Sequence, residues 1–166
     1  MKKQGFTLIE LMVVIVIMGI LAAVAVPKLF GMIAKSKASE IGTAAGSYVK
    51  LQDAYVAESA AMGNWDKIGY KMRSSETFGY DDGAAIKAAV TTNVESLGTK
   101  GQDGWVATSK VKLNDCNNKS TWTINVKAAS NSAQGMVSYT ASVSDAGQAT
   151  TPCSDLTPSF SKLSSN

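Results

Sequence analysis

Residues 5 to 27 read GFTLIELMVVIVIMGILAAVAVP, and this stretch decides the fold. Between Phe6 and Val26 every residue is apolar or glycine, except Thr7 and Glu10. At about 1.5 Å per residue, a helix of this length crosses a hydrocarbon layer of roughly 30 Å. The sequence therefore predicts a membrane-spanning helix near the N-terminus.

Two lysines before this helix predict its orientation. Lys2 and Lys3 lie in the short basic segment MKKQG, and positively charged residues beside a spanning helix are retained on the cytoplasmic side. We therefore expect the residues after Val26 to be exported.

Glu10 is costly inside such a helix, because an ionised carboxylate in a membrane is unfavourable unless a partner neutralises it. A cleaved secretory signal would use Ala23-Val24-Ala25 as its peptidase site, but the apolar region of such a signal is normally shorter. A plain single-pass anchor would explain the length of the segment and leave Glu10 without a role.

The helical pattern continues after Pro27, which removes one helical hydrogen bond and predicts a kink or a weak point. Apolar residues then recur mostly every three or four positions, as in an amphipathic helix; they are Ile41, Ala45, Tyr48, Leu51, Tyr55 and Met62. Gly63 and Asn64 provide a stop signal. One helix from Phe6 to about Met62 would be roughly 85 Å long, so lipid or other proteins must cover its first half.

The rest of the chain contains short runs with β-strand alternation, separated by residues that favour turns. Residues 104–113, 120–127 and 136–143 alternate, with Trp122, Ile124 and Val126 on one face and with Val137, Tyr139, Ala141 and Val143 on one face. We predict an α+β fold in which an antiparallel sheet of three or four strands packs on the polar half of the long helix. Residues 84–90 fit either a short helix or a strand.

Composition excludes several classes of function. The chain has no histidine, so catalysis by an imidazole base and metal binding by imidazole are ruled out. The net charge of +3 is too small and too dispersed to indicate a nucleic-acid site. Cys116 and Cys153 are two cysteines far apart, which in an exported chain favours one disulfide over free thiols or a zinc site.

The stretch KKQGFTLIELMVVIVIMGILAAVAVP, residues 2 to 27, resembles the start of a type IV pilin. The likeness consists of a short basic leader, Gly5 before the cleavage point, Phe6 as first mature residue and Glu10 as the fifth. It continues loosely along the helix to about Asn64.

The resemblance implies a maturation pathway. A membrane aspartyl peptidase, which is also the methyltransferase, would cut between Gly5 and Phe6 and methylate the new amine of Phe6. The subunit would wait in the inner membrane and then be extracted, by an assembly platform there, into an extracellular helical filament. Gly5 also has a steric reason, since a peptidase that cuts beside a bulky residue needs close backbone approach.

The resemblance also assigns roles in assembly. Phe6 and Glu10 are the assembly residues, because the Glu10 carboxylate would pair with the charged N-terminus of a neighbouring subunit. Similar proteins tend to lose helicity in the segment between Gly19 and Pro27 when packed in a filament, whereas an ordinary kinked membrane helix would keep it. A disulfide between Cys116 and Cys153 would tie the last segment of the chain to the sheet.

We therefore expect four segments: a leader at residues 1–5, a transmembrane and polymerisation helix at 6–27, an amphipathic helix half at 28–63, and a head at 64–166. The expected function is a structural pilus subunit, not an enzyme, that forms a homopolymer used in adhesion, twitching motility or DNA uptake. No cofactor, catalytic residue, metal site or specific nucleic-acid site is expected.

Two alternatives remain open. A pseudopilin of type II secretion shares the N-terminal signature, usually lacks such a disulfide, and in its major form binds calcium; the carboxylates that could do so are Asp81, Asp82, Asp103 and Asp115, although a solvated turn is the commoner role for each. A membrane-anchored carbohydrate-binding module would stack exposed aromatic rings on sugars, but such rings more often fill a core; these are Trp65, Trp105, Trp122, Tyr70, Tyr80 and Tyr139.

Overall fold

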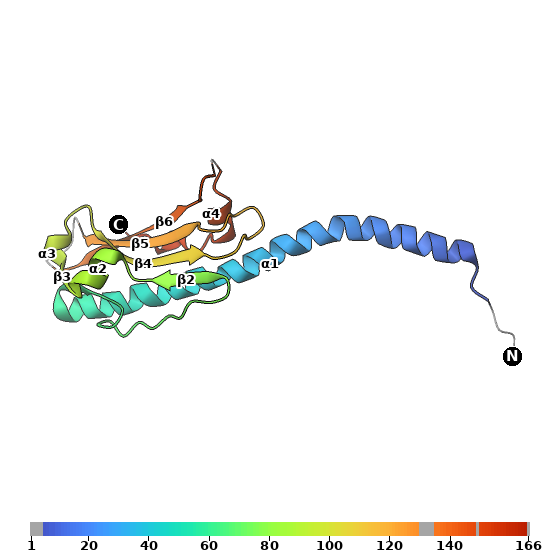
Figure 1. Ribbon diagram of the computed structural model, residues 1–166. Helices are drawn as coiled ribbons and strands as arrows, with labels where there is room; N and C mark the ends of the chain where they lie inside the picture. Colours follow the sequence, from blue (N-terminus) through green and yellow to red (C-terminus); the bar gives the residue numbers. More distant parts are fainter. Residues whose placement is uncertain (1–4, 130–134, 149, 166) are drawn as a thin grey trace.

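The computed structural model describes residues 5–129, 135–148 and 150–165. One long helix, α1, carries a head on its second half, while its first half extends away from the head along a curved path (Figure 1). The head is an antiparallel sheet with short helices at its ends. This is the α+β architecture that the sequence predicts.

Helix α1 spans Leu8–Ser59 and contains Pro27 without a break. Its C-terminal cap is Ala60, in the left-handed conformation with φ 51°, and the Ala60 N–H donates to the Val56 carbonyl. The expected end near Met62 is therefore wrong by about one turn. The chain turns earlier because Ala61–Gly63 forms strand β1, which pairs with β3, Thr91–Asn93.

Four antiparallel strands form the main sheet, in the order β2-β4-β5-β6. Their bounds are Phe78–Asp81 for β2, Gln102–Ser109 for β4, Thr121–Ala128 for β5 and Val137–Ser144 for β6. The last two match the predicted strands within one residue. The first predicted strand, which was expected to reach Leu113, ends at Ser109, because the Ser109 backbone pairs with Lys119 and Ser120 and the chain then enters a loop.

Short helices connect the sheet to the rest of the head. Residues 84–90, which fitted a helix or a strand, form α2, Ala84–Ala89, and α3 follows at Val94–Leu97. After β6 come α4, Pro152–Leu156, and a single 3-10 turn at Ser161–Leu163.

The core lies between the sheet and the second half of α1. Trp122, Ile124 and Val126 are fully buried on one face of β5, as their alternation predicts, and they meet a helix face that includes Ile41 and Tyr48. The predicted helix stripe is wrong at one point, since Leu51 is exposed.

Gln52 takes the buried position that was predicted for its neighbour Leu51. With its side-chain amide oriented to satisfy both atoms, Gln52 donates to the Gly63 carbonyl (2.9 Å) and accepts from the Gly63 N–H (3.0 Å). A buried amide is tolerated here because both of its polar atoms are paired. Gln52 thus holds β1 against the last turns of α1.

Candidate assembly interface

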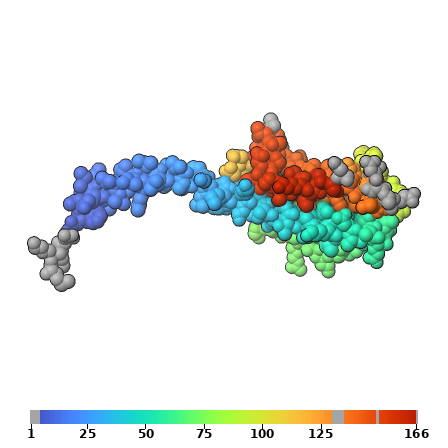
Figure 2. Space-filling model, turned by 180° about the vertical axis from the view of Figure 1, so that it is seen from behind, coloured from blue at the N-terminus to red at the C-terminus, as the bar shows by residue number. Residues whose placement is uncertain are grey.

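The first half of α1 exposes a continuous apolar surface. From Phe6 to Ile33, each large apolar side chain is at least 41% exposed, and Ala34 is the first buried residue of the helix. By length and composition this helix could cross a membrane. Figure 2 shows the first half of α1 projecting from the head, with none of the described residues of the head over it in this view. A surface this apolar requires cover by lipid or by other chains.

Glu10 lies at the N-terminal end of α1, where it takes part in a reciprocal cap with Thr7. The Glu10 Oε2 atom accepts from the Thr7 backbone N–H (2.8 Å) and from the Thr7 hydroxyl, while the Glu10 N–H donates to Thr7 Oγ1 (3.4 Å). Glu10 Oε1 accepts no hydrogen bond from the described residues, so half of the carboxylate stays available. The spacing Thr-x-x-Glu is a capping-box signature, which could have revealed the role of Thr7 from the sequence alone.

The residues expected at the cleavage point are accessible to solvent. Phe6 is 76% exposed, and apart from the chain neighbours of Gly5 none of the described residues has an atom within 4 Å of the place where a Cβ on Gly5 would stand. The leader residues 1–4 lie outside the described residues. Gly5, Phe6 and Glu10 are thus near one another at the accessible tip of α1, and their roles in cleavage, methylation and pairing stay predictions.

The segment between Gly19 and Pro27 is helical throughout in this single chain. Gly19 has open space around its Cα, so its lack of a side chain is not required by packing within the subunit. Loss of helicity here in an assembled filament stays a prediction.

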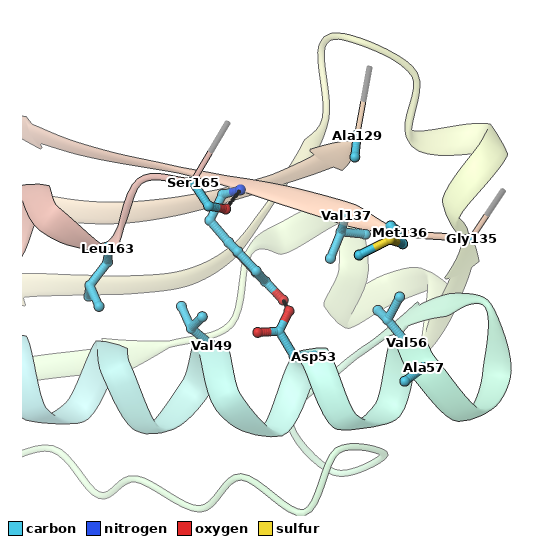
Figure 3. Close-up of a pocket in the computed structure, with 11 residues that line it drawn as sticks. Val49, Asp53, Val56, Ala57, Ala129, Gly135, Met136, Val137, Leu163 and Ser165 are labelled. Atoms are coloured by element: carbon cyan, nitrogen blue, oxygen red, sulfur yellow. Dashed lines mark hydrogen bonds between the residues drawn. The ribbon is translucent and has the colours of Figure 1, made fainter. Parts of the chain in front are cut away.

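The head is held on α1 by two tyrosines, one on each edge strand of the sheet. Tyr80 of β2 donates to Glu40 Oε1 (2.7 Å), and Tyr139 of β6 donates to Asp53 Oδ1 (2.6 Å). The Ser75 hydroxyl also donates to Glu40 Oε1 (2.7 Å). Figure 3 shows Asp53 rising from α1 toward β6. No role was predicted for Glu40 or Asp53 from the sequence.

These contacts shift the acidity of both phenols. Burial raises the pKa of Tyr80 and of Tyr139 above the usual 10.0, and the hydrogen bond and negative charge of the carboxylate partner raise it further. Both tyrosines therefore stay protonated at neutral pH and keep donating to α1.

The predicted disulfide between Cys116 and Cys153 is confirmed. It joins the loop between β4 and β5 to α4, with the two Cα atoms 4.7 Å apart, so it ties the C-terminal segment to the sheet. The Asp145 carboxylate lies beside it and accepts from the Cys153 N–H (2.8 Å). These three residues are not a metal site, because each sulfur is already bonded to the other.

The aspartates considered as calcium ligands have other partners. Asp81 pairs with Lys87 (2.8 Å), which lowers the Asp81 pKa, and Asp103 accepts from the Asn125 amide (2.9 Å). Asp115 accepts from Asn114 (2.7 Å) in an exposed turn. Within the described ranges these four carboxylates form no cluster with metal-binding geometry.

The aromatic residues mostly fill the core, which disfavours a row of rings for stacking on sugars. Trp105 and Trp122 are fully buried, and their indole N–H groups donate to the Tyr70 hydroxyl (3.0 Å) and to Thr157 Oγ1 (2.9 Å). Trp65 is half-buried and donates to the Gly104 carbonyl (2.9 Å). Each indole N–H is thus satisfied inside the head.

Comparison with known proteins agrees with this architecture. The family model described as "Prokaryotic N-terminal methylation motif" matches residues 1–26. The chain is 34% identical over 121 residues to the fimbrial protein EcpC of Eikenella corrodens, covering 68% of this chain and 77% of that protein. It is also 34% identical over 97 residues to the type IV major pilin PilA of Myxococcus xanthus, covering 58% of this chain and 44% of that protein.

A third relative is the type IV major fimbrial protein FimA of Dichelobacter nodosus, 41% identical over 85 residues, which make up 45% of this chain and 53% of FimA. The match thus spans about half the length of PilA and of FimA. No solved structure matches. The long apolar helix, the methylation motif at its start and the extended match to fimbrial proteins lead to one conclusion: the chain belongs to the type IV pilin family.

Proposed function

We propose that this chain is the structural subunit of a type IV pilus and polymerises with copies of itself through the first half of α1. The observation that carries the proposal is the exposed apolar surface from Phe6 to Ile33, which the described head leaves uncovered. A bundle of such helices would bury these surfaces against one another, which is favourable at about 25 cal/mol per Å² of apolar area removed from water. The head would then face outward.

Maturation would precede assembly. A prepilin peptidase and methyltransferase would remove residues 1–5 and methylate the Phe6 amine, and the subunit would remain in the inner membrane, held by residues 6–27, until an assembly platform extracts it. The open space at Gly5 and the exposed Phe6 support cleavage and methylation at this position, because both residues are accessible to an enzyme.

Residues 28–63 would join this spanning segment to the head, residues 64–166. The buried residues of α1 begin at Ala34, within this second segment, which supports the division. Adhesion, motility and DNA uptake are the uses that a surface filament of this kind would serve.

Glu10 would set the register between subunits. Its Oε1 atom is available, and a positively charged amine of a neighbour at about 4 Å would be attracted by roughly 4 kcal/mol at an effective dielectric near 20. Either charge alone in the helix bundle would lose a comparable solvation energy. A neighbour docked at the wrong height would therefore leave both charges unmatched.

The test is the substitution Glu10→Val, with Glu58→Gln on the exposed distal part of α1 as control. We expect both variants to be cut before Phe6 and methylated, as read by intact mass and N-terminal sequencing, and only Glu10→Val to yield much less sheared, sedimentable filament. A filament yield from Glu10→Val equal to that of wild type would contradict the proposed pairing. A mature protein that starts at Val26 would instead indicate a secretory signal.

A further inference from the structure

A small pocket lies where α1 enters the head, just beyond the membrane-spanning segment. It has a volume of about 400 Å³ and is lined by residues of α1 and of the loop between β4 and β5, namely Phe30, Ile33, Ala34, Lys37, Lys112, Leu113 and Asn114. Figure 1 shows this loop beside α1 at the end of the head nearest the N-terminal half. We call it the base pocket.

The base pocket has an apolar floor and a positively charged rim. Phe30 is 60% exposed and Ile33 is 43% exposed, and both continue the apolar surface of the spanning segment. Lys37 and Lys112 are exposed, and within the described part of the chain neither forms an ion pair. Both amines are therefore available to an anionic group.

The charges of α1 before and at the base pocket are positive. The stretch of α1 from 28 to 39 carries three lysines and no acid, and Glu40, the next acid along the helix, accepts from Ser75 and Tyr80. The nearest carboxylate in the loop, Asp115, accepts from the Asn114 amide and does not line the pocket. An occupant with a negative charge and an apolar tail complements this pocket.

The position of the base pocket along α1 corresponds to the headgroup layer of a membrane. At a tilt of about 20°, α1 from Leu8 to Ile33 spans about 35 Å, which exceeds the roughly 30 Å hydrocarbon core and lies within the roughly 40–45 Å of a bilayer with its headgroups. Helical side chains lean toward the helix N-terminus, so the Lys37 side chain leans back toward the bilayer. Long lysine side chains reach polar headgroups in this way while their stems cover apolar surface.

We propose that the base pocket binds one anionic phospholipid of the outer leaflet of the membrane that holds the unassembled subunit. Its phosphate lies between the Lys37 and Lys112 amines, and the start of its acyl chains lies along Phe30 and Ile33. The subunit thus keeps its head seated on the bilayer at a fixed height until extraction. This inference rests on the membrane anchoring stated under Proposed function.

The test is native mass spectrometry of the full chain in detergent, titrated with phosphatidylglycerol or with phosphatidylcholine. We expect one molecule of phosphatidylglycerol per chain, bound about tenfold or more tightly than phosphatidylcholine, since two lysines favour the anionic headgroup. The double variant Lys37→Gln/Lys112→Gln should reduce phosphatidylglycerol binding to the level of phosphatidylcholine. The control, Lys50→Gln/Lys100→Gln, removes the same charge from the second half of α1 and from the head, at positions that do not line the pocket, and should bind like wild type.

Equal binding of the two lipids by wild type, or unchanged binding by the double variant, would overturn the assignment. If inorganic phosphate alone displaces the lipid at equal concentration, the pocket is a site for free phosphate and the lipid assignment is wrong. If the double variant keeps its lipid but forms less filament, the pocket is a contact between copies of the chain. Flotation with phosphatidylcholine vesicles tests membrane anchoring separately. A chain whose helix is inserted floats with these vesicles whether or not the base pocket prefers an anionic headgroup.

Discussion

The Tyr139 hydroxyl on strand β6 donates to the Asp53 carboxylate on helix α1 at 2.6 Å, and this bond joins one edge of the sheet to the helix. On the opposite edge Tyr80 makes the equivalent bond to Glu40 at 2.7 Å. The sheet is therefore fixed on α1 at both edges by directed bonds as well as by the apolar core between them. In the function proposed above, extraction from the membrane through α1 would load this joint between helix and head.

The first prediction concerns Tyr139→Phe. The ring stays buried and only the hydroxyl is lost, so we expect the free energy of unfolding to fall by about 1.5–3 kcal/mol, as for loss of a hydrogen bond to a charged group. Urea unfolding of the full chain in detergent, followed by tryptophan fluorescence, measures this. Tyr55→Phe is the control, since the half-buried Tyr55 hydroxyl makes no hydrogen bond with the described residues, and a similar loss in both variants would contradict the role of the Asp53 contact.

Alkaline pH provides a second prediction. Burial and the carboxylate partners raise the pKa of Tyr80 and Tyr139 in the folded chain above the unfolded value of 10.0. The folded state therefore holds these protons where the unfolded state releases them. The stability from both contacts is fully present below pH 10 and falls as the pH rises above it.

Unfolding free energies measured between pH 8 and 12 should show this decline in wild type. The decline should be shallower in Tyr80→Phe/Tyr139→Phe, which lacks both titrating groups. Parallel curves for the two proteins would mean that other groups, such as the buried Tyr48 and Tyr70, control alkaline unfolding.

A third prediction concerns the disulfide between Cys116 and Cys153. Its sequence separation of 37 corresponds to about 4 kcal/mol on the loop-entropy estimate. The variant Cys116→Ser/Cys153→Ser should lose stability of that order, and added reductant should lower the unfolding midpoint of wild type without changing that of the variant. A midpoint of wild type that does not respond to reductant, with both thiols shown by alkylation to be free, would mean that the bridge does not stabilise the head.

Much of the fold follows from pattern. The alternation of Trp122, Ile124 and Val126 predicted a buried strand face, and the uninterrupted apolar run from Leu11 to Val26 predicted the apolar helix, because both signals are local in the sequence. The end of α1 was misplaced because Ala60 has no sequence mark of a cap. The left-handed turn there is stabilised by pairing of β1 with β3, about 30 residues away.

The tyrosine and carboxylate contacts could not be predicted for the same reason. Asp53 and Tyr139 are 86 residues apart in the chain, and a charged residue on the polar face of a helix gives no local sign that it has a partner. In contrast, the pairing of Thr7 with Glu10 at the helix start was readable from their spacing, because a capping box is local.

The last prediction concerns Gly104, where β4 passes close to α1. A Cβ at this position would collide with the Tyr48 hydroxyl and with Met62 Cε, and both of these side chains are fully buried. Gly104→Ala should therefore force the strand away from α1 and lower the free energy of unfolding by about 1–3 kcal/mol, as overpacking does. Gly79→Ala in strand β2 is a matched control, since its Cβ would meet its nearest atom at 3.7 Å, an ordinary contact.

The same Gly104 variant would also move the backbone carbonyl that accepts from the Trp65 indole. Tryptophan fluorescence of the folded state should therefore change in Gly104→Ala and stay as in wild type in Gly79→Ala. If Gly104→Ala is as stable as Gly79→Ala, then Tyr48 and Met62 can move aside. The close approach of β4 to α1 would then not require glycine at position 104.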